Sequence, residues 1–204
     1  MKKIITLIIL FQILSLNANK LGWGHEVPLD LIKRILPEDP IILEAGAHYG
    51  QDTRWMAELW PKGTIHAFEP TPVNFQRVEQ IAKEFTNIRC CTYALDIECC
   101  TKLFYQDGDE DHGNQGANSL LLHNILAKSS NPPIKVECLT IDQWASQEGV
   151  DHVDFMWLDI EGNELNALKG APNILSTVKA IFTEVNLQEF WHGAATYNTL
   201  KTWL

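Results

Sequence analysis

Short apolar runs alternate with amphipathic stretches along most of the chain. Several runs contain almost no polar position, which predicts strands buried on both faces, as in parallel sheets. The predicted strands are Ile41–Glu44, Thr64–Phe68, Ile88–Tyr93, Val153–Leu158 and Val178–Val185. The predicted helices are Asp52–Leu59, Pro72–Phe85, Ile141–Gln147 and Glu164–Leu168. This alternation predicts an α/β fold with a doubly wound, mostly parallel sheet and right-handed crossovers.

The N-terminal segment differs from this central pattern. MKKIITLIILFQILSLNANK combines a basic start, the apolar run Ile4–Leu14 and the small residue Ala18, as signal peptides do. The apolar run is shorter than the ~20 residues that span a bilayer, and a first strand or a buried helix is the structural alternative. We expect residues 1–19 to form a signal-like or anchor leader outside the core, and residues 25–204 to form one domain.

Composition narrows the choice of partners. The net charge of −10 disfavours nucleic acid, because phosphate binding needs a surplus of Lys and Arg on some face. The five cysteines lack zinc-binding spacing, so we expect mostly small buried thiols, with a disulfide as the alternative. The acidic stretch Asp107–Gly116 has no periodicity and lacks the ligand spacing of a calcium loop, which predicts a mobile loop on the substrate side.

The first predicted strand ends in the glycine-bearing turn EAGAHYG, Glu44–Gly50. Gly46 and Gly50 let the backbone bend and approach a ligand closely, and the next helix offers its N-terminus. The spacing is not the GxGxxG of dinucleotide sites, and the acid before the glycines repels phosphate. The turn therefore favours a nucleoside ligand that carries positive charge.

Further acids follow two other predicted strands. Glu69 ends the second strand, where a carboxylate can accept both hydrogens of a ribose diol. Asp159, Glu161 and Glu164 follow the fourth strand within six residues. Buried unpaired carboxylates are costly, so these acids must be solvated or functional. Glu164 has the structural alternative of favouring the N-terminus of the next helix through its dipole.

Together these segments resemble the FkbM family of S-adenosylmethionine-dependent methyltransferases. The resemblance rests on the EAGAHYG turn, HAFEP (His66–Pro70), NSLL (Asn118–Leu121), LTIDQW (Leu139–Trp144) and, most specifically, LDIEGNELNALKGA (Leu158–Ala171). It covers roughly residues 41–186 and implies a class I methyltransferase Rossmann-like domain. Such a domain normally has two more strands, so we expect a C-terminally incomplete domain with five parallel core strands and one uncovered edge.

The resemblance also implies S-adenosylmethionine as the cofactor and a hydroxyl of a small molecule or saccharide as the acceptor. In this sequence, the positions that bind the cofactor in the family lie at the ends of three predicted strands. On this basis Glu69 would bind the ribose, Asp96 would meet the adenine edge, and the methionine side would be lined by Glu44, Gly46, Ala47 and Gly50. Asp is more usual in the family at Glu44, and Asn at His48.

For the chemical step, Asp159 is the predicted general base, with Glu161 sharing substrate binding. We expect no metal in this site. The alternative is a magnesium ion held by oxygen ligands at adjacent strand ends, where Glu184 and Asn186 end the fifth strand.

Two other functions remain open at this point. An NAD-dependent oxidoreductase would share the fold and the acid after the second strand, but the turn lacks the middle glycine of its fingerprint. An exported, non-catalytic relative would explain the leader, whereas need for the cofactor indicates the cytoplasm. Membrane contact is expected only through the leader.

Overall fold

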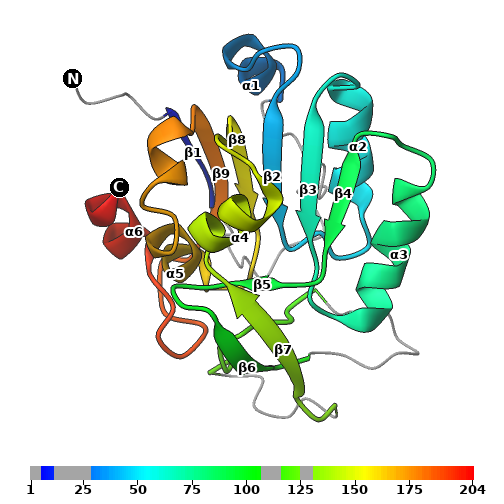
Figure 1. Ribbon diagram of the computed structural model, residues 1–204. Coiled ribbons are helices and arrows are strands. Elements are labelled where there is room, and N and C mark those ends of the chain that lie inside the picture. The colour runs from blue at the N-terminus through cyan, green and yellow to red at the C-terminus, as the bar shows by residue number, and fades with distance from the viewer. Residues whose placement is uncertain (1–5, 12–28, 107–115, 125–130) are drawn as a thin grey trace, which may run out of the picture.

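The computed structural model describes residues 6–11, 29–106, 116–124 and 131–204. Its main sheet has the order β1-β9-β8-β2-β3-β4 with all neighbours parallel (Figure 1). The strands are β1 (Thr6–Phe11), β2 (Ile41–Ala45), β3 (Thr64–Phe68), β4 (Ile88–Cys91), β8 (Phe155–Leu158) and β9 (Ala180–Val185). The chain runs from β2 to β3 and β4 on one side and later places β8 and β9 on the other. The order therefore reverses between β2 and β8, the kind of position at which open α/β sheets bind ligands.

A second, smaller sheet lies beyond the carboxyl ends of the main strands (Figure 1). Its order is β5-β7-β6, with β5 parallel and β6 antiparallel to the central β7. The three strands are β5 (Ala94–Leu95), β6 (Cys100–Phe104) and β7 (Ile134–Leu139). The apolar pattern did not predict this sheet, because β5 is very short and β6 and β7 alternate exposed with more buried positions.

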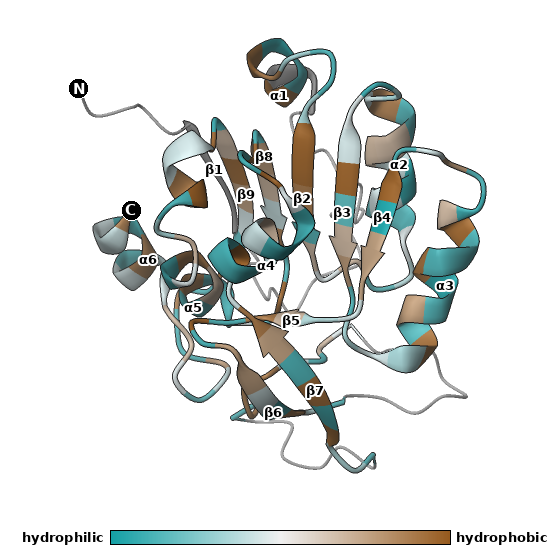
Figure 2. Ribbon diagram, in the orientation of Figure 1, coloured by the Kyte–Doolittle hydropathy of each residue, from teal (hydrophilic) through white to brown (hydrophobic). Residues whose placement is uncertain are grey.

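Helices cover both faces of the main sheet. The helices are α1 (Leu29–Ile35), α2 (Gln51–Leu59), α3 (Pro72–Ala82), α4 (Ile141–Glu148), α5 (Glu164–Lys169) and α6 (Tyr197–Trp203), with a 3₁₀ turn at Ile174–Thr177. Successive strand residues point to opposite faces. Ile42 packs into the core formed with Met56 of α2, whereas Leu43 packs into the core formed with Trp144 of α4. Both faces of the central strands are thus largely apolar, and Figure 2 colours most of β2 as hydrophobic.

All five predicted parallel strands and all four predicted helices are present, with ends shifted by a few residues. The α/β class and the mostly parallel, doubly wound sheet are confirmed. The helix α3 begins at Pro72, where proline fits because the first turn has no intrahelical partner for an amide hydrogen.

The structure differs from expectation at the N-terminus. Residues 1–19 were predicted to stay outside the fold, but β1 pairs with β9 over its whole length, from Thr6 opposite Ala180 to Phe11 opposite Val185. The main sheet therefore has six strands instead of five, and the predicted open edge at β9 is covered. An unbroken apolar run also fits a parallel strand, which is why the pattern alone could not separate the two roles. The export role of this segment stays a prediction. Within the described residues, no helix combines the length and apolar character needed to cross a membrane.

Asp154, just before β8, joins the starts of β2 and β9. Its side chain is almost fully buried, and its Oδ2 accepts the backbone N–H of Ile41 at 2.9 Å. The Nζ atom of Lys179 lies 2.7 Å from Oδ1, and the backbone N–H of the same lysine donates to the Asp154 carbonyl at 2.9 Å. One buried carboxylate thus aligns the entry of three neighbouring strands.

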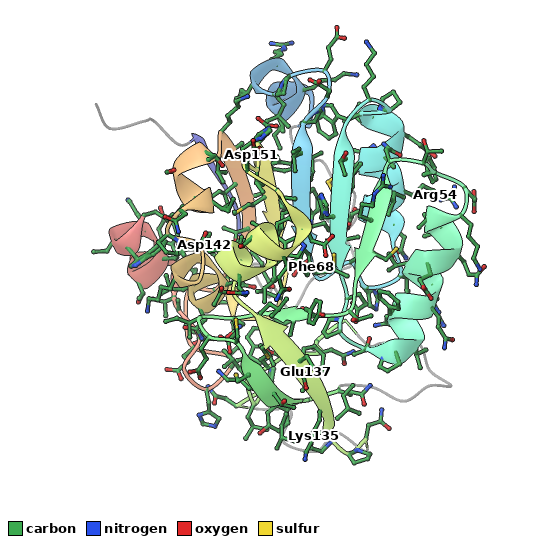
Figure 3. The ribbon with its side chains drawn as sticks, viewed as in Figure 1. Arg54, Phe68, Lys135, Glu137, Asp142 and Asp151 are labelled. Atoms are coloured by element: carbon green, nitrogen blue, oxygen red, sulfur yellow. The ribbon has the colours of Figure 1, made fainter. Side chains whose placement is uncertain are left out.

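We expect Asp154→Ala to lower the free energy of unfolding by about 1–3 kcal/mol, because the buried Ile41 amide loses its acceptor. Urea denaturation measures this change. The control is Asp151→Ala, an exposed acid at the end of the sheet remote from the small sheet (Figure 3). It should change the free energy by no more than about 0.5 kcal/mol. Equal effects of the two substitutions would contradict the alignment role of Asp154.

Candidate functional site

A cavity of about 300 Å³ lies at the carboxyl ends of β2, β3 and β8, where the main sheet meets the small sheet. Its volume is at the lower end of the range for small-molecule sites. The strand ends of the main sheet contribute carboxylates, and the small sheet contributes apolar side chains. The residues used below are Gly46, Ala47, Glu69 and Asp159 on the first side and Leu95 and Phe104 on the second.

Gly46 brings two of these strand ends together. Its φ angle is +87°, and a Cβ atom at this position would lie 1.9 Å from the carbonyl oxygen of Asp159. Any other residue would push the β2 turn away from β8. The backbone N–H of Asp159 also donates to the carbonyl of Ala45 at 3.0 Å, so the two ends remain paired up to the cavity.

Glu69 lies at the end of β3 and lines the cavity although it is only 5% exposed. Its Oε2 accepts the backbone N–H of His48 at 2.9 Å, which fixes the β2 turn to β3. Its Oε1 accepts the backbone N–H of Thr71 at 2.9 Å and the hydroxyl of the same threonine. Burial raises the pKa of Glu69, and these hydrogen bonds act in the opposite direction.

Asn74 adds a second polar group beside Glu69. Its amide lies within hydrogen-bonding reach of the Glu69 carboxylate. The side chain is buried and lines the cavity, and no group in the described part of the chain hydrogen-bonds to its Oδ1 atom. A buried polar atom without a partner is rare in proteins, and here it borders a cavity able to hold a ligand.

The turn after β8 carries the other acids. Asp159 is exposed and Glu161 half-buried, and both line the cavity. Glu161 has a φ angle of +54°, a strained conformation for a residue with a side chain. The hydroxyl of Ser119 donates to the Glu161 carbonyl at 2.7 Å and helps to hold this conformation.

Glu164 also stabilises the turn after β8. Its Oε1 accepts the backbone N–H groups of Ile160 at 3.0 Å and Gly162 at 3.2 Å. Burial raises the pKa of Glu164 to about 7. The observed contacts therefore give Glu164 the structural role that the sequence left open, at the start of α5 rather than in the cavity.

Glu184, near the end of β9, lies behind this turn. One carboxylate oxygen from each of Asp159, Glu161 and Glu184 lies within 4.8 Å of the others. Burial, together with the negative charges of Glu161 and Asp159, raises the pKa of Glu184 to about 11. The three side chains form the most acidic part of the site.

Three of the predicted cofactor residues do not line the cavity. Gly50 begins α2 with a φ angle of +80°. Glu44 is 1% exposed and points to the opposite face of the sheet, where Thr53 donates its hydroxyl to Oε2 at 2.6 Å. Asp96 is buried in an ion pair with Lys102 and accepts the backbone N–H of Ile97 at 2.8 Å. The predicted residues that do come together are Gly46, Ala47, Glu69, Asp159 and Glu161.

Several residues of the site were not predicted. Leu95, next to Asp96, lines the cavity instead, whereas the Asp96 side chain pairs with Lys102. Phe104 was missed together with the small sheet that carries it. Asn74 lies inside a predicted helix, and no motif or spacing in the sequence identified it as a site residue. Ser119 belongs to the NSLL segment that the sequence analysis singled out, but its hydrogen bond to the Glu161 carbonyl was not predicted.

Comparisons with known proteins place this geometry in context. The profile described as "Methyltransferase FkbM domain" matches residues 44–204. The chain is 26% identical over 175 residues to the 2-O-methyltransferase NoeI of Sinorhizobium fredii, a match that covers 82% of this chain and 72% of NoeI. It is 26% identical over 149 residues to Methyltransferase 1 of Beauveria bassiana, covering 66% of this chain and 59% of that protein. Among solved structures, the fibrillarin/Nop5p complex matches with a TM-score of 0.45 at 17% identity, covering 82% of this chain and 60% of the matched one.

The buried carboxyl of Glu44 makes stability depend on pH. Burial raises its pKa to about 8, against an ordinary value of 4.5. Between these values the folded state holds a proton that the unfolded state has released, so stability is greatest at low pH and falls as pH rises. The slope from one such group is about 1.4 kcal/mol per pH unit. We expect Glu44→Gln, which cannot titrate, to reduce this slope in urea denaturation series between about pH 5 and 8. Parallel curves for the two proteins would contradict a protonated Glu44.

Proposed function

Because the chain belongs to the methyltransferase FkbM domain family, we propose that it transfers a methyl group from S-adenosylmethionine to a hydroxyl oxygen of a small molecule or sugar. The observation that carries the proposal is the convergence of Gly46, Glu69 and Asp159, from three separate motifs, on one cavity at the topological switch point. An oxygen acceptor is also supported by the relative NoeI, whose name describes a 2-O-methyltransferase.

The described residues fit this cofactor. Glu69 lines the cavity at the end of β3, where its carboxylate offers a charged acceptor for a ribose hydroxyl. The partnerless Oδ1 of Asn74 offers a second acceptor beside it. Leu95 and Phe104 supply the apolar wall that a flat base requires. When bound, S-adenosylmethionine supplies a methyl group on a positively charged sulfur, which the acidic end of the cavity favours.

The charge of the cavity also favours an uncharged acceptor. None of its described lining residues is a lysine or arginine, whereas Asp52, Glu69, Asp159 and Glu161 are acids. A phosphorylated or carboxylated acceptor would be repelled and would find no basic partner there. A neutral polyhydroxyl compound can instead donate hydrogen bonds to these carboxylates.

Asp159 is our candidate for the general base. It lines the cavity at the end of β8, and its exposure allows contact with an acceptor hydroxyl. Its backbone is fixed by the Ala45 carbonyl and by the close approach of Gly46. A carboxylate held in this way can orient the hydroxyl and accept its proton as the oxygen attacks the methyl carbon. Glu161, in the same turn, would bind another acceptor hydroxyl.

The two rival functions are less well supported. An NAD-dependent oxidoreductase needs a pyrophosphate site, and the β2 turn instead has an acid before its glycines and the side chains of three residues between them. A non-catalytic relative would not need the cavity, Glu69 and Asp159 to remain together. Titration with both cofactors, followed by mass measurement of the acceptor, separates the three functions.

We expect Glu69→Ala to weaken S-adenosylmethionine binding by roughly 1.5–3 kcal/mol, because a charge-assisted hydrogen bond to the ribose is lost. Calorimetric titration measures the affinity. The control is Glu148→Ala, an exposed acid at the end of α4, which should bind the cofactor like the unmodified protein. Unchanged affinity in a folded Glu69→Ala protein would remove the ribose role.

Asp159→Asn tests the chemical step. It keeps the shape and hydrogen bonding of the side chain but removes the base, so turnover should fall by roughly 10²–10⁴-fold. Affinity for S-adenosylmethionine should change little, since Glu69 and the apolar wall are intact. Near-normal turnover would exclude the general-base role, and a large loss of cofactor affinity would instead place Asp159 among the cofactor contacts.

A further inference from the structure

The acidic group behind the cavity is built from two neighbouring strand ends. Asp159 and Glu161 follow β8, and Glu184 is the second-last residue of β9. One oxygen from each carboxylate lies within 4.8 Å of the other two. Two oxygens on opposite sides of a cation would be separated by about 4–5 Å at the ligand distances of Mg²⁺ and Ca²⁺. The spacing therefore suits three ligands of one small ion.

Glu184 gives the independent sign that a ligand is missing from this group. Its side chain is only 4% exposed, and outside the acidic cluster itself, where it faces the Asp159 carboxyl, no group in the described part of the chain hydrogen-bonds to either of its oxygens. The charged groups that act on it, which are Glu161, Asp159 and Glu164, are all acids. Two residues further on, the buried Oδ1 of Asn186 also has no hydrogen-bond partner among the described residues. Partnerless buried oxygens of this kind are what a cation would satisfy.

A second acidic group in the same chain shows the contrast. Asp96 lies with the thiols of Cys100 and Cys138 in a similarly tight cluster. There the protein supplies its own cation, because Lys102 forms an ion pair with the buried Asp96 carboxylate. No such ion pair is found for the equally buried Glu184 among the described residues. The cluster at the cavity is the one that needs a cation from solution.

We propose that Asp159, Glu161 and Glu184 bind one hard divalent cation, with Mg²⁺ as the expected ion, at the acceptor end of the cavity. All three ligands are carboxylates, which suit Mg²⁺, Mn²⁺ and Ca²⁺ rather than metals that prefer sulfur or nitrogen. The site differs from the metal-free one that the sequence predicted. The proposal that the site binds an ion rests on the cluster alone, whereas the proposal that the ion takes part in catalysis rests on the proposed methyl transfer.

Within that reaction the ion would orient the acceptor hydroxyl and make it more acidic. A carboxylate has two oxygens, so Asp159 can contact the ion with one and accept the hydroxyl proton with the other. The oxygen–carbon bond forms as the carbon–sulfur bond breaks. The electron pair of the carbon–sulfur bond remains on the sulfur, which becomes neutral. The acceptor proton ends on Asp159, and no further reactant is required.

The test is a titration of the purified full chain with Mn²⁺, which replaces Mg²⁺ at oxygen sites and is detected by electron paramagnetic resonance. No cofactor or acceptor is added. We expect saturable binding of one ion, competed by Mg²⁺, and a loss of affinity of roughly 10–100-fold or more in Glu184→Gln. The matched control is Glu44→Gln, which removes a similarly buried carboxylate of the same sheet that already has a donor in the Thr53 hydroxyl, and it should bind Mn²⁺ normally.

Glu161→Gln, at a half-buried position, serves as the second variant should Glu184→Gln fail to fold, and we expect the same loss. The proposal is overturned when the unmodified chain shows no saturable Mn²⁺ binding, or when both cluster variants bind as tightly as it does. Cofactor binding in the presence of a chelator is measured separately. Metal binding without methyl transfer would refute the proposed reaction but support the metal site. Metal-independent turnover without Mn²⁺ binding would support the reaction and refute the metal site.

Discussion

The candidate site depends on the contact between the β2 turn and the end of β8. Gly46 has no side chain, so its backbone can lie against the carbonyl of Asp159 at a distance that any Cβ would prevent. This contact places Ala47 and the rest of the β2 turn next to the acids of the turn after β8. The glycine is thus required for close approach of two protein segments, and the ligand site is a consequence of that approach.

Burial of several carboxyl groups at one end of the sheet is the second constraint. The protein meets this demand differently at each position. Glu44 accepts a hydroxyl hydrogen bond, Glu69 accepts backbone amides from two turns, and Glu164 accepts amides of the turn after β8. Glu69 and Glu164, which accept backbone amides, fix the turns that border the cavity. Among the four, only Glu184 has no donor from outside its own acidic cluster in the described part of the chain, and for this reason we propose it as a metal ligand.

The sequence predicts those parts of the fold in which burial imposes a continuous apolar run. That condition holds for β2, β3, β8 and β9, and their predicted ranges agree closely with the structure. It does not hold for the small sheet, whose strands are half-exposed and whose pairing joins Cys100 to Cys138 across a long stretch of chain. The apolar run at residues 6–11 was visible, but parallel strands and signal peptides share that pattern, so only the pairing with β9 decides its place.

Within the site, sequence could identify the acids but not the direction of their side chains. Glu44 and Asp96 lie one residue from cavity-lining Ala45 and Leu95, but Thr53 hydrogen-bonds to Glu44 on the other face of the sheet and Lys102 forms an ion pair with Asp96. In the turn after β8, the sequence identified an acid but not the backbone conformation that brings it to the cavity. Glu161 reaches the cavity through a positive φ angle, which costs roughly 1–3 kcal/mol and is held by Ser119 from a distant segment. His48, in the β2 turn, has a similar φ angle of 51° and is held by Glu69. These two strained residues flank the same cavity, and each is fixed by a side chain from another strand end or loop. Local sequence preference would disfavour both conformations, so the geometry of the site arises from tertiary contacts that no single motif contains.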